Sequence, residues 1–251
     1  MPEAPLRERS GASPGVVSFV RRSSRMNPSQ RQALELLADR YVVDVPTGEL
    51  STSIAAGASI DWHGTFGRPV GPGASELMVE VGSGTGDALV ASARANPDAS
   101  LIAFEVYEAA VASTLAKLSA AGLHNVRLLM LDAVQGLSQL IEPGMVSELA
   151  TYFPDPWPKK RHHKRRLVSR SFAELAASRL TPGGRWLLAT DWPDYAQQMR
   201  HVLDATPGLV NEYRDSGGWA PRPASRPITK FEARGIADGR PVTDLAYRRA
   251  P

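Results

Sequence analysis

The chain has 251 residues, of which 43% are hydrophobic and 22% charged, proportions that are ordinary for a globular protein with a substantial core. Its formal net charge is only +3, so any preference for a polyanion must come from local patches of charge. The absence of cysteine excludes disulfides, zinc–thiolate sites, iron–sulfur clusters and cysteine nucleophiles.

The hydropathy of the sequence and its first residues indicate where the protein is located. No run approaches the roughly 18 apolar residues that could span a bilayer, and the first residues lack the apolar core of a secretory signal. We therefore expect a soluble, cytoplasmic protein with no membrane partner. Residues 1–15, rich in Pro, Gly, Ser and charge, are expected to be a disordered tail, and residues 16–251 a single domain.

The domain begins with residues 16–45, which we expect to form an arm and a helix over 28–40 with an apolar stripe. A connection over 46–75 follows, and from there strands alternate with helices. The strands are expected at 76–81, 100–105, 126–131, 148–153 and 185–190, and the helices at 87–95, 107–121, 168–179 and 194–206. The Thr-Pro-Gly-Gly sequence at 181–184 is expected to end the third of these helices.

Two further extended segments, 209–214 and 242–248, complete the pattern. Strands that alternate with helices of this length are typical of the α/β class. The sequence therefore predicts a Rossmann-like fold, with a mostly parallel seven-stranded sheet and helices on both faces.

Five of the predicted strands deliver a carboxylate to the same edge of the sheet, where ligands of open α/β folds bind. These acids are Glu80, Glu105, Asp132, Asp155 and Asp191. A single acid at such a position can be a helix N-cap or a first-turn acid. Five in succession favour a ligand that is rich in hydroxyl and amine donors.

The loop after the first strand reads Gly82-Ser-Gly84-Thr-Gly86. A dinucleotide site would read Gly-x-Gly-x-x-Gly and would hold a pyrophosphate at the helix N-terminus. Here Glu80 and Asp87 flank the loop and would repel a pyrophosphate, whereas they suit a cationic nucleoside.

Two of the acids suit the rest of such a nucleoside. Glu105, which lies 19 residues past Gly86, can accept hydrogen bonds from both ribose hydroxyls, and Asp132 with Ala133 can accept from an adenine amine. The pattern therefore favours S-adenosylmethionine over NAD as the cofactor.

Residues 153–166 read Phe-Pro-Asp-Pro-Trp-Pro-Lys-Lys-Arg-His-His-Lys-Arg-Arg. Two prolines restrict Asp155 to an extended or turn conformation. Trp157 can either stack on a base or anchor the loop in the core. Residues 159–166 contain six Lys or Arg, two His and no acid, which favours phosphate binding over a solvated helix start. No third ligand with suitable spacing accompanies the histidines, so no metal site is expected.

These motifs resemble a known family when they are read in order. They are Glu80-Val-Gly-Ser-Gly-Thr-Gly, Phe-Glu105-Val, Asp132-Ala-Val, the 153–166 segment, Thr190-Asp191-Trp192 and Arg226-Pro-Ile-Thr-Lys-Phe-Glu232-x-Arg-Gly. Over roughly residues 17–249 the chain closely resembles the bacterial tRNA (guanine-N7-)-methyltransferase family. The Phe-Pro-Asp-Pro-Trp and Thr-Lys-Phe-Glu motifs are specific to that family, whereas the glycine loop is shared by most class I methyltransferases. Pro158 departs from relatives that often carry His.

The resemblance implies methyl transfer from S-adenosylmethionine to N7 of a guanosine in the tRNA variable loop, with S-adenosyl-L-homocysteine as the product. It implies cofactor binding by Glu80, Gly82, Gly84, Gly86, Glu105, Asp132 and Asp155, with Asp155 also at the catalytic centre. It implies substrate contacts by Lys159, Arg161, His162, His163, Lys164, Arg165, Arg166, Asp191, Thr229, Lys230, Phe231 and Glu232. Arg21, Arg22 and Arg25 are candidates to extend the RNA surface, and either a monomer or a homodimer is compatible with the sequence.

Three other functions compete with this one. A class I methyltransferase that acts on another RNA, a protein or a small molecule shares the cofactor motifs. If its substrate is a protein or a small molecule, it has no need for the basic run at 159–166. A nicotinamide-dependent oxidoreductase is disfavoured by the glycine spacing and its flanking acids. A non-catalytic RNA-binding module has no need of Glu80, Glu105 and Asp132, all of which are present.

Overall fold

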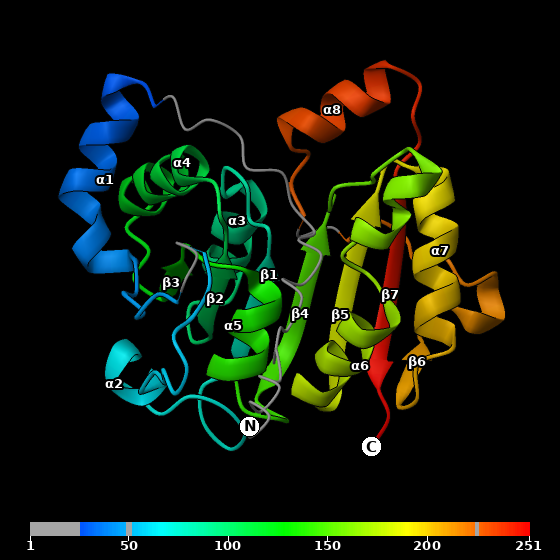
Figure 1. Ribbon diagram of the computed structural model, residues 1–251, viewed down its shortest axis with the longest axis horizontal. Coiled ribbons are helices and arrows are strands. Elements are labelled where there is room, and N and C mark those ends of the chain that lie inside the picture. Colours follow the sequence, from blue (N-terminus) through cyan, green and yellow to red (C-terminus); the bar gives the residue numbers. More distant parts are fainter. Residues whose placement is uncertain (1–25, 49–51, 224–225) are drawn as a thin grey trace, which may run out of the picture.

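The computed structural model describes residues 26–48, 52–223 and 226–251, without the side chains of Lys230, Phe231 and Arg234 (Figure 1). The strands are β1 (Leu77–Val81), β2 (Ser100–Phe104), β3 (Val126–Leu129), β4 (Val146–Tyr152), β5 (Leu180–Thr190), β6 (Leu209–Asn211) and β7 (Thr243–Arg249). The α-helices are α1 (Pro28–Tyr41), α2 (Trp62–Phe66), α3 (Asp87–Ala95), α4 (Glu108–Ala120), α5 (Ala133–Leu140), α6 (Arg170–Arg179), α7 (Pro193–Asp204) and α8 (Lys230–Ala237).

The seven strands form one sheet in the order β3-β2-β1-β4-β5-β7-β6. Strands β1 to β5 are parallel, whereas β7 runs antiparallel to both β5 and β6. In Figure 1 the parallel strands point to the upper edge, where α8 lies, and β7 points the other way. The predicted fold class, a mostly parallel seven-stranded Rossmann-like sheet, is confirmed.

Alternate residues of the strands feed two separate cores, one on each face of the sheet. Val79 and Val81 of β1 pack with α5, α6 and α7, whereas Met78 packs with α1, α3 and α4. A strand that is buried on both faces needs a continuous apolar run, and β2 with its sequence Ser-Leu-Ile-Ala-Phe is buried throughout. The two cores fix the sheet and leave its upper edge for the loops that follow the strands.

The elements predicted from the sequence differ from the observed ones mainly around β5. The Thr-Pro-Gly-Gly sequence was expected to lie between a helix and a strand, but it lies inside β5. Its register with β4 shifts between Val146 and Glu148. Gly184 allows this close pairing, because a Cβ there would meet the Val146 carbonyl oxygen at 2.9 Å. The helix ends instead at Arg179, directly before the strand.

Three short helices, α2, α5 and α8, were not among the predicted elements. Each has eight residues or fewer, too few turns for an apolar period to stand out. The helix predicted over 28–40 is confirmed as α1, which begins with a capping box between Asn27 and Gln30. The predicted tail and the arginines at 21, 22 and 25 lie outside the described residues. Across the described part of the chain, none of the helices has the length and hydropathy needed to cross a bilayer.

Candidate active site

A cleft of about 770 Å³ opens at the upper edge of the sheet. It is lined by the glycine loop after β1 and by the ends of β2, β4 and β5, with Thr229, Asp238 and Arg240 of the C-terminal segment on the far side. Six carboxylates line this one cleft, those of Glu80, Asp87, Glu105, Asp155, Asp191 and Asp238. Such a cleft disfavours an anionic ligand and favours one that carries positive charge or many hydrogen-bond donors.

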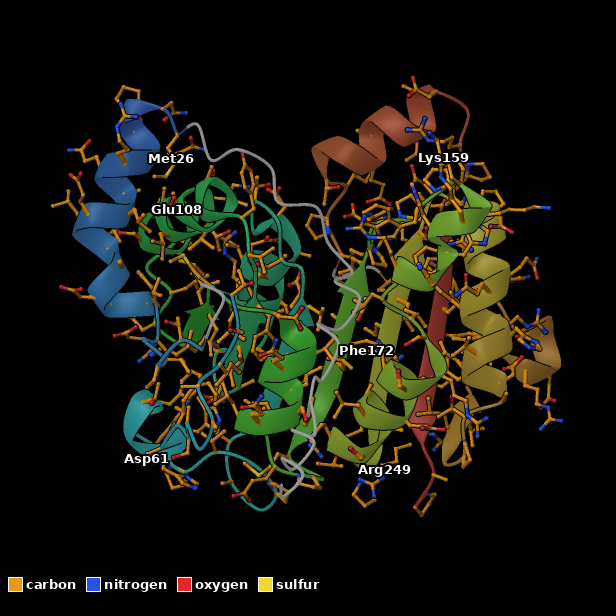
Figure 2. All side chains as sticks on the ribbon, in the orientation of Figure 1. Met26, Asp61, Glu108, Lys159, Phe172 and Arg249 are labelled. Atoms are coloured by element: carbon orange, nitrogen blue, oxygen red, sulfur yellow. The ribbon has the colours of Figure 1, made fainter. Side chains whose placement is uncertain are left out.

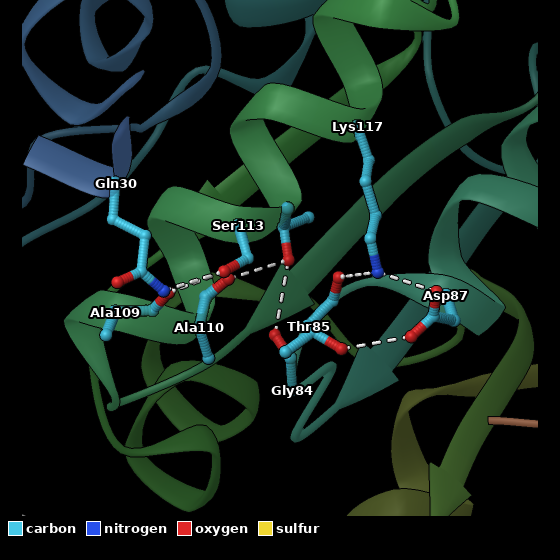
Figure 3. Close-up of polar contacts among 9 residues, drawn as sticks. Gln30, Gly84, Thr85, Asp87, Ala109, Ala110, Ser113 and Lys117 are labelled. Atoms are coloured by element: carbon cyan, nitrogen blue, oxygen red, sulfur yellow. Dashed lines mark hydrogen bonds and ion pairs between the residues drawn. The ribbon is translucent and has the colours of Figure 1, made fainter. Parts of the chain in front are cut away.

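Side chains of α4 hold the glycine loop in place (Figure 3). The Lys117 ammonium lies 2.6 Å from Asp87 Oδ1 and donates to the Thr85 carbonyl oxygen at 2.8 Å. The Thr114 hydroxyl lies 3.2 Å from the Gly84 carbonyl oxygen. Gly86 has φ +79°, and a Cβ there would lie 2.6 Å from the Thr114 side chain, so both its conformation and its surroundings require glycine.

The opposite side of the loop is open. A Cβ on Gly82 or Gly84 would find no heavy atom within 4 Å, so the loop backbone faces free space where it borders the cleft. Ser83, between these two glycines, has a buried hydroxyl with no hydrogen-bond partner among the described residues. Ser83 also lines the cleft, beside the open backbone of Gly82 and Gly84.

Glu105 follows β2 and closes the loop from the side. Its Oε2 accepts from the Gly84 N–H and its Oε1 from the Tyr107 N–H, both at 2.8 Å. Burial raises the pKa of the Glu105 carboxyl, the backbone hydrogen bonds oppose that shift, and the negative charge of Asp155 adds to it. The influence of Asp155 shows that the acids after β2 and β4 share one electrostatic environment.

Glu80 is the most buried of the six carboxylates that line the cleft, with only 7% of its surface exposed. Burial, followed by the negative charges of Glu105 and Asp87, raises the pKa of the Glu80 carboxyl from 4.5 to about 8. In the protein without a ligand Glu80 is therefore mostly protonated at neutral pH. A cationic ligand group would favour its ionised form.

Asp132 occupies a different position from the other predicted acids. It is the N-cap of α5, and its Oδ1 accepts from the N–H groups of Val134 and Gln135 at 2.8 and 3.1 Å. Its neighbours Leu131, Ala133 and Val134 line the cleft, but Asp132 itself does not. The structure thus shows a capping role for this side chain, and its cofactor contact stays a prediction.

The loop that carries Asp155 has an unusual backbone. Phe153 and Trp157, with φ of 51° and 44°, are the non-glycine residues with positive φ in the described part of the chain. Residues other than glycine adopt this backbone conformation at a cost of about 1–3 kcal/mol each, and such strain clusters at functional sites. The Phe153 N–H bonds the Ala189 carbonyl oxygen at 2.8 Å, which ties the loop to the end of β5. Asp155, held between these two residues, lines the cleft.

Trp157 anchors the basic run to this loop. The Arg165 guanidinium stacks over the Trp157 ring at 3.6 Å, and His162 meets the ring edge-on at 5.9 Å. These contacts favour the anchoring role for Trp157, because one ring face is already covered by a cation.

The basic run itself forms a 3₁₀ helix over Lys160–Arg165. Figure 2 places Lys159, just before it, at the upper edge of the molecule, the same edge as the cleft. Lys159, Lys160, Arg161 and Lys164 are exposed. Partial desolvation, followed by the charges of Arg161 and Lys159, lowers the pKa of His162.

Arg166 differs from the rest of the run because only 3% of its surface is exposed. Its guanidinium bonds Asp194 at 2.6 Å, Gln198 at 2.5 Å and the Pro156 carbonyl oxygen at 2.8 Å. A buried guanidinium with three partners is not accessible to a phosphate. The prediction that Arg166 contacts RNA is therefore withdrawn: its side chain joins the Asp155 loop to α7.

The segment before α8 is held by a buried cluster of charges. Arg226 Nη2 bonds both oxygens of Asp244 at 2.9 and 3.0 Å, and its Nη1 lies 2.9 Å from Glu232 Oε2. The same guanidinium lies over the rings of Tyr152 and Phe153 at 5.4 and 5.3 Å. Arg226 therefore joins the end of β4 to α8 and β7.

The predicted substrate contacts in this segment divide accordingly. Glu232 is 1% exposed and paired with Arg226, so its carboxylate is part of the buried cluster and is not directed to a ligand. Thr229 lines the cleft, and its hydroxyl accepts from the Glu232 N–H at 3.1 Å. The side chains of Lys230 and Phe231 lie outside the described residues.

Asp191, at the end of β5, faces the C-terminal segment across the cleft. Arg240 Nε donates to its Oδ2 at 2.9 Å, and Gly235 packs so closely that an added Cβ would lie 3.2 Å from the same oxygen. Asp155 and Asp191, predicted together, are thus brought to one cleft. The sequence analysis singled out neither Ser83, although it lies within the glycine loop, nor Arg240, which belongs to none of the motifs. It identified Arg226 only as part of a motif.

The comparisons with known proteins agree with this geometry. Residues 74–245 match the family described as "Putative methyltransferase" (Methyltransf_4). The chain belongs to the tRNA (guanine-N(7)-)-methyltransferase family. Proteins of that name from Cutibacterium acnes and Nocardioides sp. are each 49% identical to this chain over 235 residues, covering 94% and 93% of it and 83% and 87% of their own lengths. The one from Nitrosococcus oceani is 40% identical over 94% of this chain and 91% of its own. The family predicted from the motifs is thus confirmed.

The raised pKa of Glu80 predicts how stability depends on pH. Folding favours the protonated carboxyl, so its contribution is complete below pH 4.5 and is lost as pH rises through about 8. The unfolding free energy of the ligand-free protein should fall by up to about 1.4 kcal/mol per pH unit between these values because of Glu80. Urea unfolding at pH 6, 7 and 8 measures this slope.

The E80Q variant should flatten that slope, because glutamine does not titrate. Glu76, exposed just before β1, provides the matched control, and E76Q should keep the wild-type slope. Equal slopes in wild type and E80Q would show that Glu80 is already ionised in the ligand-free protein.

Proposed function

We propose that this protein transfers a methyl group from S-adenosylmethionine to N7 of a guanosine in tRNA, in the variable loop as its family resemblance implies. The observation that carries this proposal is the single cleft that joins the glycine loop and Glu105 to Asp155 and Asp191. A ligand that donates hydrogen bonds and carries positive charge suits one end of that cleft, and the exposed basic run lies beside the other end. The membership in the tRNA (guanine-N(7)-)-methyltransferase family supports the same activity.

The residues of the cleft fit the cofactor. Glu105 keeps lone pairs for ribose hydroxyls, the loop backbone at Gly82 and Gly84 is open, and the Ser83 hydroxyl lacks a partner in the described part of the chain. Glu80 would pair with a positive group of the ligand. S-Adenosylmethionine supplies the reaction with a methyl group on a positively charged sulfur.

Guanine N7 has a lone pair and carries no proton, so the reaction requires no strong base. The bond between N7 and the methyl carbon forms as the carbon–sulfur bond breaks, positive charge moves onto the purine, and S-adenosyl-L-homocysteine is the product. The protein's task is to align the two partners and to stabilise the moving charge. Asp155 accepts hydrogen bonds from the donor edge of guanine, Asp191 supports it, and both carboxylates favour the purine as it becomes cationic.

The tRNA backbone binds outside the acidic cleft. The rim beside the Asp155 loop carries six basic residues that do not line the cleft: Lys159, Arg161, His162, His163, Lys164 and Arg165. This separation lets the protein attract a polyanion while its acids hold the cofactor and the base. Thr229, on the opposite side, remains a proposed contact of the target nucleoside.

The direct test is transfer from methyl-labelled S-adenosylmethionine to unmodified tRNA, followed by nucleoside analysis. Labelled 7-methylguanosine is the expected product. Cofactor binding without transfer to tRNA, or another labelled nucleoside, would contradict the proposal. The first of those results would favour a methyltransferase that acts on a protein or a small molecule.

The role of Asp155 predicts the kinetics of D155N. Loss of one charge that stabilises the transition state should lower kcat by about 100-fold, whereas the affinity for S-adenosylmethionine changes far less. Single-turnover rates and cofactor titrations separate the two quantities. Asp98, exposed at the opposite end of the sheet, is the matched control, and D98N should retain wild-type rates. Wild-type turnover in D155N would remove Asp155 from the mechanism.

The basic run predicts how tRNA affinity depends on salt. If about four phosphates are contacted, the logarithm of the association constant should fall against log[salt] with a slope of about −3. A variant lacking three exposed charges of this run, K159Q/R161Q/K164Q, should have a slope of about −1. Arg170, exposed just after the run and paired with Glu174, is the control, and R170Q should keep the wild-type slope. A triple variant with the wild-type slope would place the phosphates elsewhere.

A further inference from the structure

The charges around the cleft are unequally distributed. Among the described residues that line it, Arg240 is the one Lys or Arg, facing six carboxylates. A nucleotide that enters the cleft brings its phosphates with it, and those carboxylates repel phosphate. Arg240 therefore marks the place along the cleft where an anion can be tolerated.

The position of Arg240 is fixed by backbone and side chain together. It follows α8 and Gly239, which has φ +73°, and its N–H bonds the Gly235 carbonyl oxygen at 2.8 Å. Its Nε donates to Asp191 Oδ2 at 2.9 Å and its Nη1 to Asp238 Oδ2 at 3.1 Å. The guanidinium is thus oriented by one carboxylate from the sheet and one from its own segment.

These contacts leave part of the guanidinium for a ligand. An arginine has five N–H donors, and the contacts to Asp191 and Asp238 use two of them. The side chain is 39% exposed and lines the cleft, so the remaining donors, on Nη1 and Nη2, can meet a ligand there. A planar fork that is already held in place loses little freedom when it binds the oxygens of a phosphate.

We propose that Arg240 binds a backbone phosphate next to the target guanosine and so orients that nucleotide toward Asp155. This inference rests on the proposed function and adds a contact to its substrate side. Arg240 uses only Oδ2 of Asp191, so Oδ1 is left for the base. One ion pair would then couple the position of the phosphate to that of the carboxylate that supports catalysis.

A competing explanation is that Arg240 serves Asp191 alone, as a counter-ion. Loss of Arg240 would then alter turnover but would remove no contact with the tRNA backbone. The two explanations differ in the salt dependence of tRNA binding, which only a lost phosphate contact changes.

The experiment compares R240Q, R240K and R248Q with wild type. It measures tRNA dissociation constants at several salt concentrations in the presence of S-adenosylhomocysteine and, separately, single-turnover methyl transfer from S-adenosylmethionine. Arg248 is exposed at the other end of β7, where it pairs with Arg185 in the sheet. R248Q therefore removes the same charge away from the cleft.

R240Q should weaken tRNA binding by about tenfold and reduce the magnitude of the salt slope by about 0.7–0.9. R240K should restore most of the slope, because it keeps the charge. R248Q should match wild type in both quantities. The affinity for S-adenosylhomocysteine should be unchanged in all three variants.

A wild-type salt slope in R240Q, with reduced turnover only, would overturn the proposal in favour of the counter-ion role. Equal slope changes in R240Q and R248Q would also overturn it, because the effect would then be one of net charge. Failure of the proposed function itself is recognised separately, since the wild-type protein would then form no 7-methylguanosine in tRNA.

Discussion

The site depends on the point where the sheet reverses its order between β1 and β4. The chain passes from β1 outward to β2 and β3, then returns to place β4 on the other side of β1 and continues to β5. The loops after β1 and β4 therefore leave in opposite directions, and a crevice opens between them. Glu80 and the glycine loop stand on one side of it, and Asp155 and Asp191 on the other, because parallel strands bring their C-terminal ends to one edge.

Several carboxylates in one partly buried cleft repel one another, and the structure reduces this repulsion in different ways. Glu80 takes up a proton, Glu105 accepts two backbone hydrogen bonds, Asp87 pairs with Lys117 and Asp191 pairs with Arg240. A cationic cofactor would relieve the same repulsion, so the cleft is prepared for positive charge. The cations that suit tRNA stand on the rim, where solvent screens them from the acids.

Much of this arrangement could be predicted from sequence because it depends on chain order. The strands that alternate with helices fix the sheet, and an acid at the end of a parallel strand must lie at the common edge. Asp155 and the glycine loop were found in this way. The partners of individual side chains could not be predicted in this way. Arg166 ends a run of cations but turns inward to Asp194, and Glu232 stands in a motif of apparent ligands but pairs with Arg226 in the interior. The direction of the Arg166 side chain depends on a residue 28 positions away, and the Arg226 that pairs with Glu232 is itself held by Asp244 of β7.

The backbone conformations were also outside what the sequence could give. The prolines around Asp155 limited its conformation, but they did not predict that Phe153 and Trp157 would adopt positive φ. That conformation depends on contacts made by other elements, with Arg226 over the Phe153 ring and Arg165 over the Trp157 ring. The Asp155 loop is therefore shaped by tertiary structure, as is the position of Arg240 across the cleft.

The central claim is that the two sides of the crevice hold different molecules, with the cofactor on the side of β1 and β2 and the guanosine on the side of β4 and β5. A crystal structure of the protein with S-adenosylhomocysteine tests this most directly. We expect the ribose hydroxyls to contact Glu105, the adenosine to lie along the glycine loop and the sulfur to face Asp155. A ligand whose sulfur points away from Asp155, or whose ribose lies beside Asp191, would contradict it.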